Sequence, residues 1–279
     1  MKIGIMGLGY VGGATCKFLE SKKIKVYKYD KYKKIGSVAE VNSSDIVFIC
    51  VPTPYNKNGF DLSFVEAAIQ VLENSKTIVI KSSVVPGTTE NLQKKYPKHK
   101  FLFNPEFLKE VSAYQDFIHP DRQIVGYTSK SKTVAVDVLK LLPKSSYSET
   151  MPATEAETVK YMANTFLSLK VVFANEFFEL CRGLGLNYEE VRLAVGEDKR
   201  ISPSHLDVAH GGYRGYGGSC FPKDVNAILE FAEKKKVKMP LLKAMREVNR
   251  KLLKKSGLSE EYFLRNKHKN PNDPKKVKN

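Results

Sequence analysis

One segment of the sequence places a potential nucleophile among glycines and beside charged residues. It runs Gly-Tyr-Gly-Gly-Ser-Cys-Phe-Pro-Lys-Asp over residues 215–224. A nearby ammonium group, here that of Lys223, favours the thiolate form of a cysteine, which is the form that attacks carbon. Asp224 follows Cys220 by four residues, so on a helical turn it would face the same side and could act as a base. These residues alone are also compatible with a second interpretation, a glycine-rich loop in which the cysteine is buried and has no catalytic role.

A second segment has the spacing of a dinucleotide-binding loop. Gly7, Gly9 and Gly12 form Gly-x-Gly-x-x-Gly directly after an expected strand and at the start of an expected helix. The first glycine allows a tight turn, the second lets the backbone approach a pyrophosphate, and the third lets helix and strand pack closely. The free N–H groups at the start of that helix, near Tyr10 and Val11, are expected to bind the phosphates.

An acidic residue stands where such a loop needs one. Asp30 ends the second expected strand, 18 residues after Gly12. A carboxylate there accepts hydrogen bonds from the ribose hydroxyls and repels a 2′-phosphate, which favours NAD over NADP. Lysines next to Asp30 could tolerate a 2′-phosphate, so NADP stays an alternative; they are Lys28, Lys31, Lys33 and Lys34.

Alternating strands and helices in the first half would position these residues. The expected strands are Lys2–Met6, Lys25–Tyr29, Ile46–Val51, Thr77–Ile80, Phe101–Phe103 and Ile124–Val125, and the first two helices are Val11–Ser21 and Asp61–Leu72. Repeated βα units predict a parallel sheet with helices on both faces. Right-handed crossovers then make it a Rossmann-type doubly wound α/β fold, which we expect as an NAD-binding domain over residues 1–150.

The pattern changes near residue 150 and becomes helical. No glycine or proline occurs between Thr154 and Cys181, and apolar residues recur at helical spacing, which predicts a helix of about seven turns. Shorter helices are expected at Asn187–Gly196, Val225–Lys236 and Leu241–Lys255. We therefore expect an all-α central domain over 151–256 that forms a homodimer through the long helix. Residues 257–279 are expected to be a basic, disordered tail.

Composition narrows the function classes. The net charge is +16, from 46 Lys/Arg against 30 Asp/Glu, but residues 232–279 contribute +11 of it. The four cysteines and five histidines are scattered, so no metal site is expected. The absence of a signal-peptide pattern and of any apolar window near 18 residues predicts a cytoplasmic protein without a membrane span. Nucleic acid binding by the basic end is a rival function, although the sequence contains no recognised nucleic-acid module.

Further motifs occur in an order that resembles the UDP-glucose/GDP-mannose dehydrogenase family. After the glycine loop come Val51-Pro52-Thr53-Pro54, Lys81-Ser82-Ser83-Val84, Pro86-Gly87-Thr88, Asn104-Pro105-Glu106-Phe107-Leu108 and Pro120-Asp121-Arg122; then follow Glu155, Lys160, Asn164 and Asn175-Glu176, the stretch from Asp198 to Ile201, and residues 215–224. Together they cover residues 1 to about 255. Members of this family oxidise the primary alcohol of a sugar nucleotide to a carboxylate and use two NAD per turnover.

The resemblance implies a role for each matching residue. Cys220 matches the nucleophile, while Lys160 and Asn164 match the residues that bind substrate and stabilise the oxyanion of the tetrahedral adducts. Asp224 and a water held by Ser83 match the groups that transfer protons. Glu106 matches the residue implicated in hydrolysis of the thioester. Additional cofactor contacts are expected from Thr53, Ser82, Glu110 and Lys223, and additional substrate contacts from Phe107, Leu108, Arg200, Tyr216 and Gly217. Arg200 matches an arginine that reaches the substrate of a neighbouring subunit.

Several departures from the family pattern leave alternatives open. Ser83 stands where threonine is usual, Val111 follows Glu110 where glycine is usual, and Ser202 replaces a glycine after Arg200-Ile201. The residues after 255 do not resemble the family's third domain, which holds the nucleotide of the substrate. UDP-glucose is the expected substrate, with GDP-mannose or UDP-N-acetyl-mannosamine as alternatives. A catalytically incomplete remnant that binds NAD is a further alternative.

Overall fold

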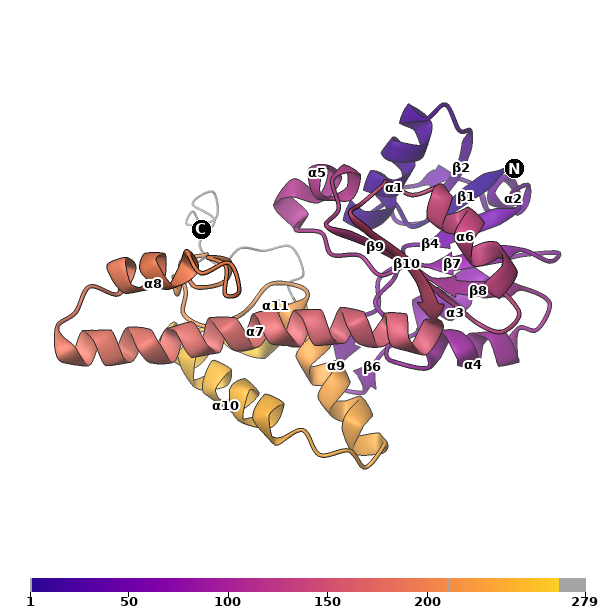
Figure 1. Cartoon of the computed structure of the whole chain (residues 1–279). Helices are drawn as coiled ribbons and strands as arrows, with labels where there is room; N and C mark the ends of the chain where they lie inside the picture. The colour runs from indigo at the N-terminus through magenta and orange to yellow at the C-terminus, as the bar shows by residue number, and fades with distance from the viewer. Residues whose placement is uncertain (1, 210, 266–279) are drawn as a thin grey trace. The chain divides into compact units, whose positions relative to one another are not determined.

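The computed structural model describes residues 2–209 and 211–265, which form two compact units (Figure 1). Among the described residues, the first unit comprises 2–54 and 60–160, and the second comprises 55–59, 161–209 and 211–265. The strands are β1 (Ile3–Met6), β2 (Val26–Asp30), β3 (Ile35–Gly36), β4 (Ile46–Ile49), β5 (Tyr55–Asn56), β6 (Gly59–Phe60), β7 (Thr77–Ile80), β8 (Lys100–Phe103), β9 (Arg122–Tyr127) and β10 (Tyr147–Pro152). The predicted α/β fold with a following helical region is confirmed.

Helices connect the strands and make up most of the second unit. In the first half they are α1 (Tyr10–Ser21), α2 (Val38–Asn42), α3 (Ser63–Gln70), α4 (Thr88–Lys95), the short 3₁₀ helix η1 (Glu110–Ser112), α5 (Ala113–Ile118) and α6 (Lys132–Lys140). The second half contains α7 (Ala153–Leu184), α8 (Tyr188–Gly196), α9 (Phe221–Lys234), α10 (Pro240–Lys255) and α11 (Glu260–Arg265). None of the described helices is long and apolar enough to cross a membrane.

The first unit is built around one eight-stranded sheet of order β10-β9-β8-β7-β4-β1-β2-β3. The central strands β8, β7, β4, β1 and β2 are parallel, as predicted. From β1 the chain goes first to β2 on one side and later to β4 on the other, so the strand order reverses between β1 and β4. In open α/β sheets this switch point is where ligands bind, beyond the carboxyl ends of the strands.

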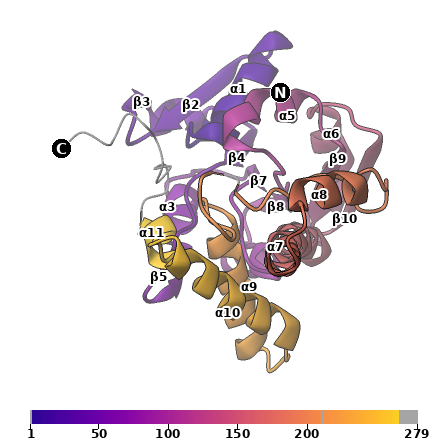
Figure 2. The same cartoon turned by 90° about the vertical axis from the view of Figure 1, so that its left-hand side faces the viewer.

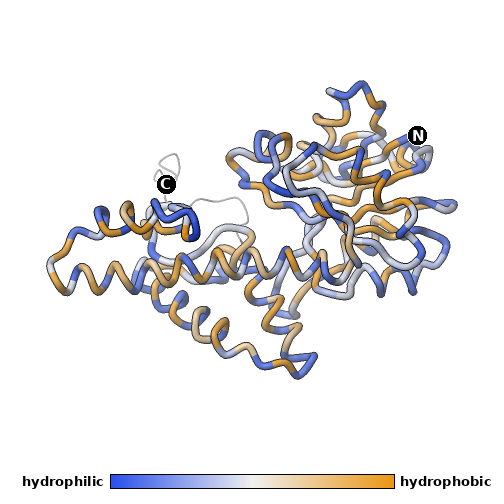
Figure 3. Tube along the Cα trace, in the orientation of Figure 1, coloured by the Kyte–Doolittle hydropathy of each residue, from blue (hydrophilic) through white to orange (hydrophobic). Residues whose placement is uncertain are grey.

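Two apolar layers cover the sheet, one on each face. Phe18 of α1, Phe117 of α5 and Val138 of α6 belong to one buried cluster. Ile69 of α3 and Leu92 of α4 belong to the other. The central strands β1 and β4 are buried along their whole length and carry no charged residue, as expected for parallel strands covered on both faces (Figure 3). This double layer holds the loops at the strand ends in fixed positions.

The second unit is organised along α7. This helix has 32 residues and is therefore about 48 Å long, and Figure 2 views it nearly along its axis. Its continuity follows from the absence of glycine and proline over most of its length, as predicted. Val171 and Val172 of α7 pack with Val225 and Leu229 of α9 and with Met245 of α10 in one buried cluster.

The structure differs from the predictions in the direction of two strands, in one additional strand and in one additional helix. Strand β3 is antiparallel to β2, and β9 is antiparallel to β8, so the sheet is mostly rather than wholly parallel. Strand β10 was not predicted, and a domain boundary at residue 150 falls inside it. The expected disordered tail begins at 257, but α11 lies within it, and Glu260 and Phe263 of α11 are buried. The rest of that tail lies outside the described residues.

A hairpin from the first half of the sequence belongs to the second unit. Tyr55 of this hairpin hydrogen-bonds Glu230 of α9, and burial together with this carboxylate raises the pKa of Tyr55 to about 12. Gly59 has a φ of +94°, and a Cβ there would lie 2.6 Å from Oε1 of Glu230. The positive φ of Gly59 favours glycine at this turn of the hairpin, and the Glu230 carboxylate lies in the space next to it.

Candidate active site

The predicted dinucleotide loop lies at the switch point, between β1 and α1. Gly7 has a φ of +88°, and its N–H donates to the carbonyl oxygen of Tyr29 at 2.9 Å. A Cβ on Gly12 would overlap the carbonyl oxygen of Gly7, so helix and turn are as close as the motif requires. Gly9, the N-cap of α1, has open space where a Cβ would point. The loop therefore combines close packing with one open face at the helix N-terminus.

Asp30 ends β2 and holds the loop through its carboxylate. Oδ2 accepts the N–H of Leu8 at 2.7 Å, and Oδ1 accepts the N–H groups of Tyr32 and Lys33 at 3.0 and 2.9 Å. Burial alone would raise the pKa of Asp30, but these three donors and the Lys33 ammonium bring it below its usual range. A carboxylate oxygen has two lone pairs, so Oδ2, which accepts only the Leu8 N–H among the described residues, has capacity for one more hydrogen bond.

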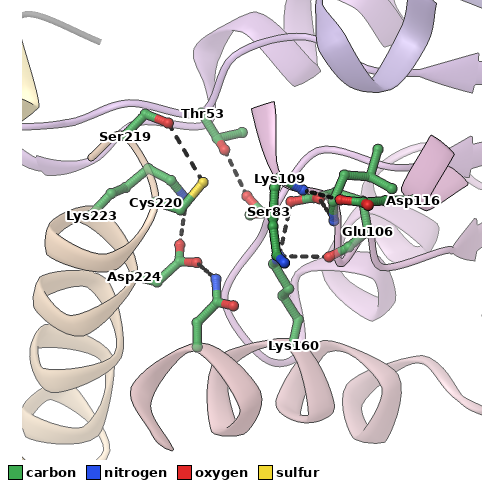
Figure 4. A network of polar contacts seen from close by, with 12 residues as sticks. Thr53, Ser83, Glu106, Lys109, Asp116, Lys160, Ser219, Cys220, Lys223 and Asp224 are labelled. Atoms are coloured by element: carbon green, nitrogen blue, oxygen red, sulfur yellow. Dashed lines mark hydrogen bonds and ion pairs between the residues drawn. The ribbon is translucent and has the colours of Figure 1, made fainter. Parts of the chain in front are cut away.

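A buried ion pair joins the loop after β8 to α7. Lys160 Nζ lies 2.9 Å from Oε1 of Glu106 and 2.6 Å from the carbonyl oxygen of Glu106 (Figure 4). The side chains are only 4% and 10% exposed. Burial alone would raise the pKa of Glu106, but the Lys160 ammonium and the N–H of Leu108 together bring it below its ordinary value. Glu106 is therefore held as a carboxylate.

A second buried lysine lies at the same end of the sheet. Lys81 directly follows β7, and its ammonium donates to Oδ1 of Asn104, which directly follows β8. Asn104 in turn donates from Nδ2 to the carbonyl oxygen of Ile124 in β9 at 2.7 Å. Burial lowers the pKa of Lys81 to about 8, although the carboxylate of Glu106 opposes the fall. This pair ties three strand ends together.

In the second unit, Cys220 is the N-cap of α9 and Asp224 lies in the first turn of that helix. The partial positive charge of a helix N-terminus favours an anion such as a thiolate. Asp224 is fully buried and accepts Nδ2 of Asn164 at 2.5 Å and the ammonium of Lys223 (Figure 4). The structure therefore brings together four residues of the predicted site, Cys220, Lys223, Asp224 and Asn164.

The remaining predicted residues fall into four groups. Thr53 and Ser82 are buried, and the Thr53 hydroxyl donates to the carbonyl oxygen of Ser83 at 2.7 Å. Phe107 and Leu108 are half-buried next to Glu106, and Arg122 stacks on the Phe107 ring at 3.8 Å. Glu110 and Arg200 are exposed, and Arg200 pairs with Asp198 at 2.6 Å. Tyr216 and Gly217 lie in the loop before Cys220.

The residues around the dinucleotide loop and the Glu106–Lys160 pair belong to one compact unit, and those around Cys220 belong to the other. Glu106, Lys160 and the glycine loop belong to the first unit, and Asn164, Cys220 and Asp224 belong to the second. Only α7 contributes to both sets, since Lys160 and Asn164 lie one turn apart on it. The described residues contain no cluster of three or more His, Cys, Asp or Glu side chains that could hold a metal ion.

Comparison with known proteins assigns both halves to one family. Residues 31–142 match the NAD binding domain of the UDP-glucose/GDP-mannose dehydrogenase family, and residues 154–251 match the central domain of the same family. UDP-glucose 6-dehydrogenase from Rickettsia conorii is 36% identical over 90% of this chain and 67% of its own length. The chain belongs to the UDP-glucose/GDP-mannose dehydrogenase family. It spans about two thirds of the length of the curated relatives that it matches.

Solved structures agree with this family. A UDP-glucose dehydrogenase from the archaeon Pyrobaculum islandicum superposes with a TM-score of 0.78 at 31% identity, covering 91% of this chain and 71% of that one. GDP-mannose dehydrogenase from Pseudomonas aeruginosa gives 0.64 at 27% identity, covering 92% and 70%. These results confirm the predicted family, its NAD cofactor and its enzyme class.

Two residues of the site were not predicted as functional. Lys81 and Asn104 appear in the family-like motifs, but their side chains had no assigned role. The signal was their position, because each directly follows a buried strand at the carboxyl edge of the sheet, where the ligands of such sheets bind. The sequence did not indicate that both side chains are buried and in contact, because this contact forms only when the two strand ends meet in the fold.

Proposed function

We propose that this chain oxidises the primary alcohol of UDP-glucose to a carboxylate in two NAD-dependent steps through a covalent intermediate on Cys220. The observation that carries the proposal is the arrangement at the start of α9, where a cysteine caps the helix one turn before a fully buried carboxylate paired with an amide and an ammonium. Such a set serves nucleophilic attack by a thiolate with a positioned proton acceptor.

The residues present fit NAD. The close approach of Gly12 to Gly7, the open face at Gly9 and the carboxylate of Asp30 at the end of β2 are what a dinucleotide requires. The N–H groups that begin α1 would bind the pyrophosphate, and Asp30 would bind the adenosine ribose. NAD, when bound, supplies the hydride acceptor for both oxidations.

In the first step the substrate alcohol loses a hydride from carbon and a proton from oxygen, which gives an aldehyde. Asp224, or a water on the hydroxyl of Ser83, accepts the proton. The Cys220 thiolate then adds to the aldehyde carbon, and the resulting oxyanion takes a hydrogen bond from the Asn164 amide or the Lys160 ammonium. Loss of a second hydride from the carbon of this oxyanion, to a second NAD, leaves a thioester on Cys220.

Hydrolysis completes the reaction. Water adds to the thioester carbon, the carbon–sulfur bond breaks, and the products are the sugar carboxylate and the Cys220 thiol. We assign activation of that water to Glu106, which the Lys160 ammonium keeps ionised and therefore able to accept a proton.

The substrate is tested with a panel at fixed NAD. The purified chain is incubated with UDP-glucose, GDP-mannose and UDP-N-acetyl-mannosamine, and NADH and the sugar acid are quantified together. We expect two NADH per UDP-glucose consumed and slower turnover of the other two. NADH binding without turnover of any of the three would identify a non-catalytic NAD-binding protein and overturn the proposal.

The open face at Gly9 gives a test of the cofactor site that leaves the fold intact. The φ of Gly9 is −66°, which alanine adopts readily, and no atom lies within 4 Å of the added Cβ. We expect Gly9→Ala to keep or slightly raise the thermal stability. Its methyl group would occupy the place of the pyrophosphate, so NADH binding should weaken on the order of tenfold or more. Fluorescence titration with NADH and a thermal melt measure the two effects.

The control for this test is Gly87→Ala, at a glycine that also has open space but lies outside the dinucleotide loop. Its positive φ makes the substitution mildly destabilising, but NADH affinity should stay unchanged. Unchanged NADH affinity in Gly9→Ala would show that the pyrophosphate does not approach this part of the loop.

We also propose that two copies of the chain associate through α7. An apolar stripe follows this helix at steps of three and four residues and consists of Met162, Phe166, Leu169, Phe173, Phe177, Leu180 and Leu184. All except Leu169 are exposed, from 44% at Phe177 to 73% at Met162. A second copy of the same stripe is the partner that fits, because steps of three and four residues are those by which paired helices interlock.

Substitution within the stripe tests the dimer. Phe173→Glu places a charge in the middle of the stripe, so we expect the mass from light scattering to fall from that of a dimer to that of a monomer. Lys235→Glu, an exposed position on the C-cap of α9, is the control and should leave the mass unchanged. A monomeric mass for the wild-type chain would contradict the proposal directly.

A further inference from the structure

The loop before Cys220 has a backbone that glycines permit but do not fix. Gly215 and Gly218 have φ values of +88° and +75°, which few other residues adopt. Glycine also populates many other conformations at little cost, so the glycines alone would leave this loop variable. Something else in the fold must hold the loop in the shape that leads into Cys220 and α9.

One holding group comes from α10. The Asn249 side chain is fully buried, and its amide pairs with both polar groups of the Tyr216 backbone. Oδ1 accepts the Tyr216 N–H at 2.7 Å, and Nδ2 donates to the Tyr216 carbonyl oxygen at 3.0 Å. A Cβ on Gly215 would lie 2.5 Å from the same Oδ1, so the amide fills the space next to this glycine. Asn249 therefore pairs with the loop as a neighbouring strand would.

The second holding group comes from α11. Phe263 is 3% exposed, and a Cβ on Gly217 would lie 2.5 and 2.6 Å from Cζ and Cε1 of its ring. The ring also packs on Tyr213 at the other end of the loop, with centroids 5.1 Å apart. Phe263 therefore contacts the loop on both sides of the residue that Asn249 holds.

The helix that carries Phe263 is itself anchored. Glu260 opens α11 and is 4% exposed. Its Oε2 accepts Nε of Arg250 from α10 at 3.0 Å and Nδ2 of Asn226 from α9 at 3.4 Å. A buried charge paired in this way resists displacement, because breaking the pair leaves an uncompensated charge. The anchor fixes the position of the Phe263 ring relative to α9 and α10.

We propose that Asn249 and Phe263 are positioning residues for Cys220. Together they fix the backbone of Gly215–Gly217, and this backbone sets where the thiol lies relative to the N-terminus of α9 and to Asp224. A displacement of about 1 Å at a reacting group can lower the rate 10²-fold, so holding this backbone in place should affect the rate of the reaction at Cys220. The inference rests on the proposed role of Cys220, and it makes α11 part of the machinery that serves the thiol.

Variants of the two residues test the proposal in the full chain. Asn249→Ala removes both hydrogen bonds, and Phe263→Ala removes the ring, whereas Phe263→Leu keeps most of the volume. We expect kcat to fall about 10- to 100-fold in the two alanine variants and much less in Phe263→Leu. The affinity for NADH should not change, because the dinucleotide loop belongs to the other compact unit.

Alkylation separates positioning from simple loss of stability. Iodoacetamide modification of Cys220 and Cys181 is followed by peptide mass spectrometry. Release of the loop should raise the rate at Cys220 severalfold, while the buried Cys181 of α7 keeps its wild-type rate. Leu206→Ala is the matched control, since Leu206 is buried in a different cluster of the same unit and should lower stability without changing the Cys220 rate.

Two outcomes would overturn the proposal. In one, kcat and the Cys220 alkylation rate in both alanine variants equal those of Leu206→Ala. In the other, the Cys181 rate rises together with the Cys220 rate, which would show that the residues only stabilise the fold. Failure of the proposed function is distinguished by Cys220→Ser, because NADH formation that persists in that variant removes the catalytic role of the thiol but leaves the alkylation result intact.

Discussion

Cys220→Ser is expected to abolish the formation of NADH from UDP-glucose, with a loss of turnover on the order of 10⁴-fold or more. A serine hydroxyl at neutral pH is a far weaker nucleophile than a thiolate at a helix N-terminus, and no thioester can form on it. The rate of NADH formation and the amount of sugar acid, measured in the same reaction, report the loss.

The fold should tolerate this substitution, because Cys220 is the N-cap residue of α9 and is only partly buried. NADH affinity and thermal stability are therefore expected to remain near their wild-type values. Cys181→Ala, in the same unit but on α7, is the matched control and should retain turnover. Full two-step turnover by Cys220→Ser would remove the thiol from the mechanism.

Lys160→Met is expected to lower both stability and activity. It leaves the Glu106 carboxylate buried without its cation, which costs about 3–5 kcal/mol in the free energy of unfolding. It also removes a donor to the oxyanion, which costs on the order of 10²- to 10³-fold in kcat. Urea unfolding and steady-state kinetics measure the two losses separately.

The double variant Lys160→Met/Glu106→Gln distinguishes the two effects. Removing both charges should recover much of the lost stability, because no unpaired charge remains, but it should not recover activity. A double variant as unstable as the single one would show that the pair contributes through packing rather than charge.

The pH dependence of Lys160→Met has a definite sign. In the wild type the pKa of Glu106 lies below its usual range, so the pair stabilises the fold above that range and loses its contribution as the pH falls through the lowered pKa. In the variant burial acts without the ammonium, so the pKa of Glu106 should rise. The stability gap between variant and wild type should therefore narrow from neutral pH to about pH 5.

Some of the site could be predicted because its signals are local. The glycine spacing and Asp30 report a turn and a strand end that sit next to each other in sequence. The one-turn separation of Lys160 and Asn164 follows from an uninterrupted helix. Cys220 and Asp224 are likewise one turn apart, and each of these pairs needs only its own element to form.

Other parts depend on contacts between distant segments and could not be predicted from patterns. Strand β10 reads Tyr-Ser-Glu-Thr-Met-Pro and has no apolar alternation, because it lies at the sheet edge with largely exposed side chains. The antiparallel direction of β9 depends on the path of the connection from β8, which the residues of the strand itself do not report. The buried pair of Lys81 and Asn104 needs two strand ends to meet, since a lysine alone predicts an exposed charge.

The order of α11 was missed for the same reason. Its surroundings are rich in lysine and polar residues, which favours disorder when the composition is averaged. Two side chains, Glu260 and Phe263, decide the outcome through contacts with elements far earlier in the chain. A composition averaged over a window of residues does not report the burial of one aromatic side chain such as Phe263.

The hairpin that begins at Tyr55 has a consequence for how the chain is made. The polypeptide passes between the two compact units three times, after Pro54, after Gly59 and after Lys160. Glu230 leaves the ribosome about 170 residues after Gly59, and contacts over such separations form late because of their loop-closure entropy. The early half of the nascent chain therefore cannot complete its native contacts until α9 has been synthesised. Cutting the gene at residue 160 would give a fragment whose hairpin lacks its partner.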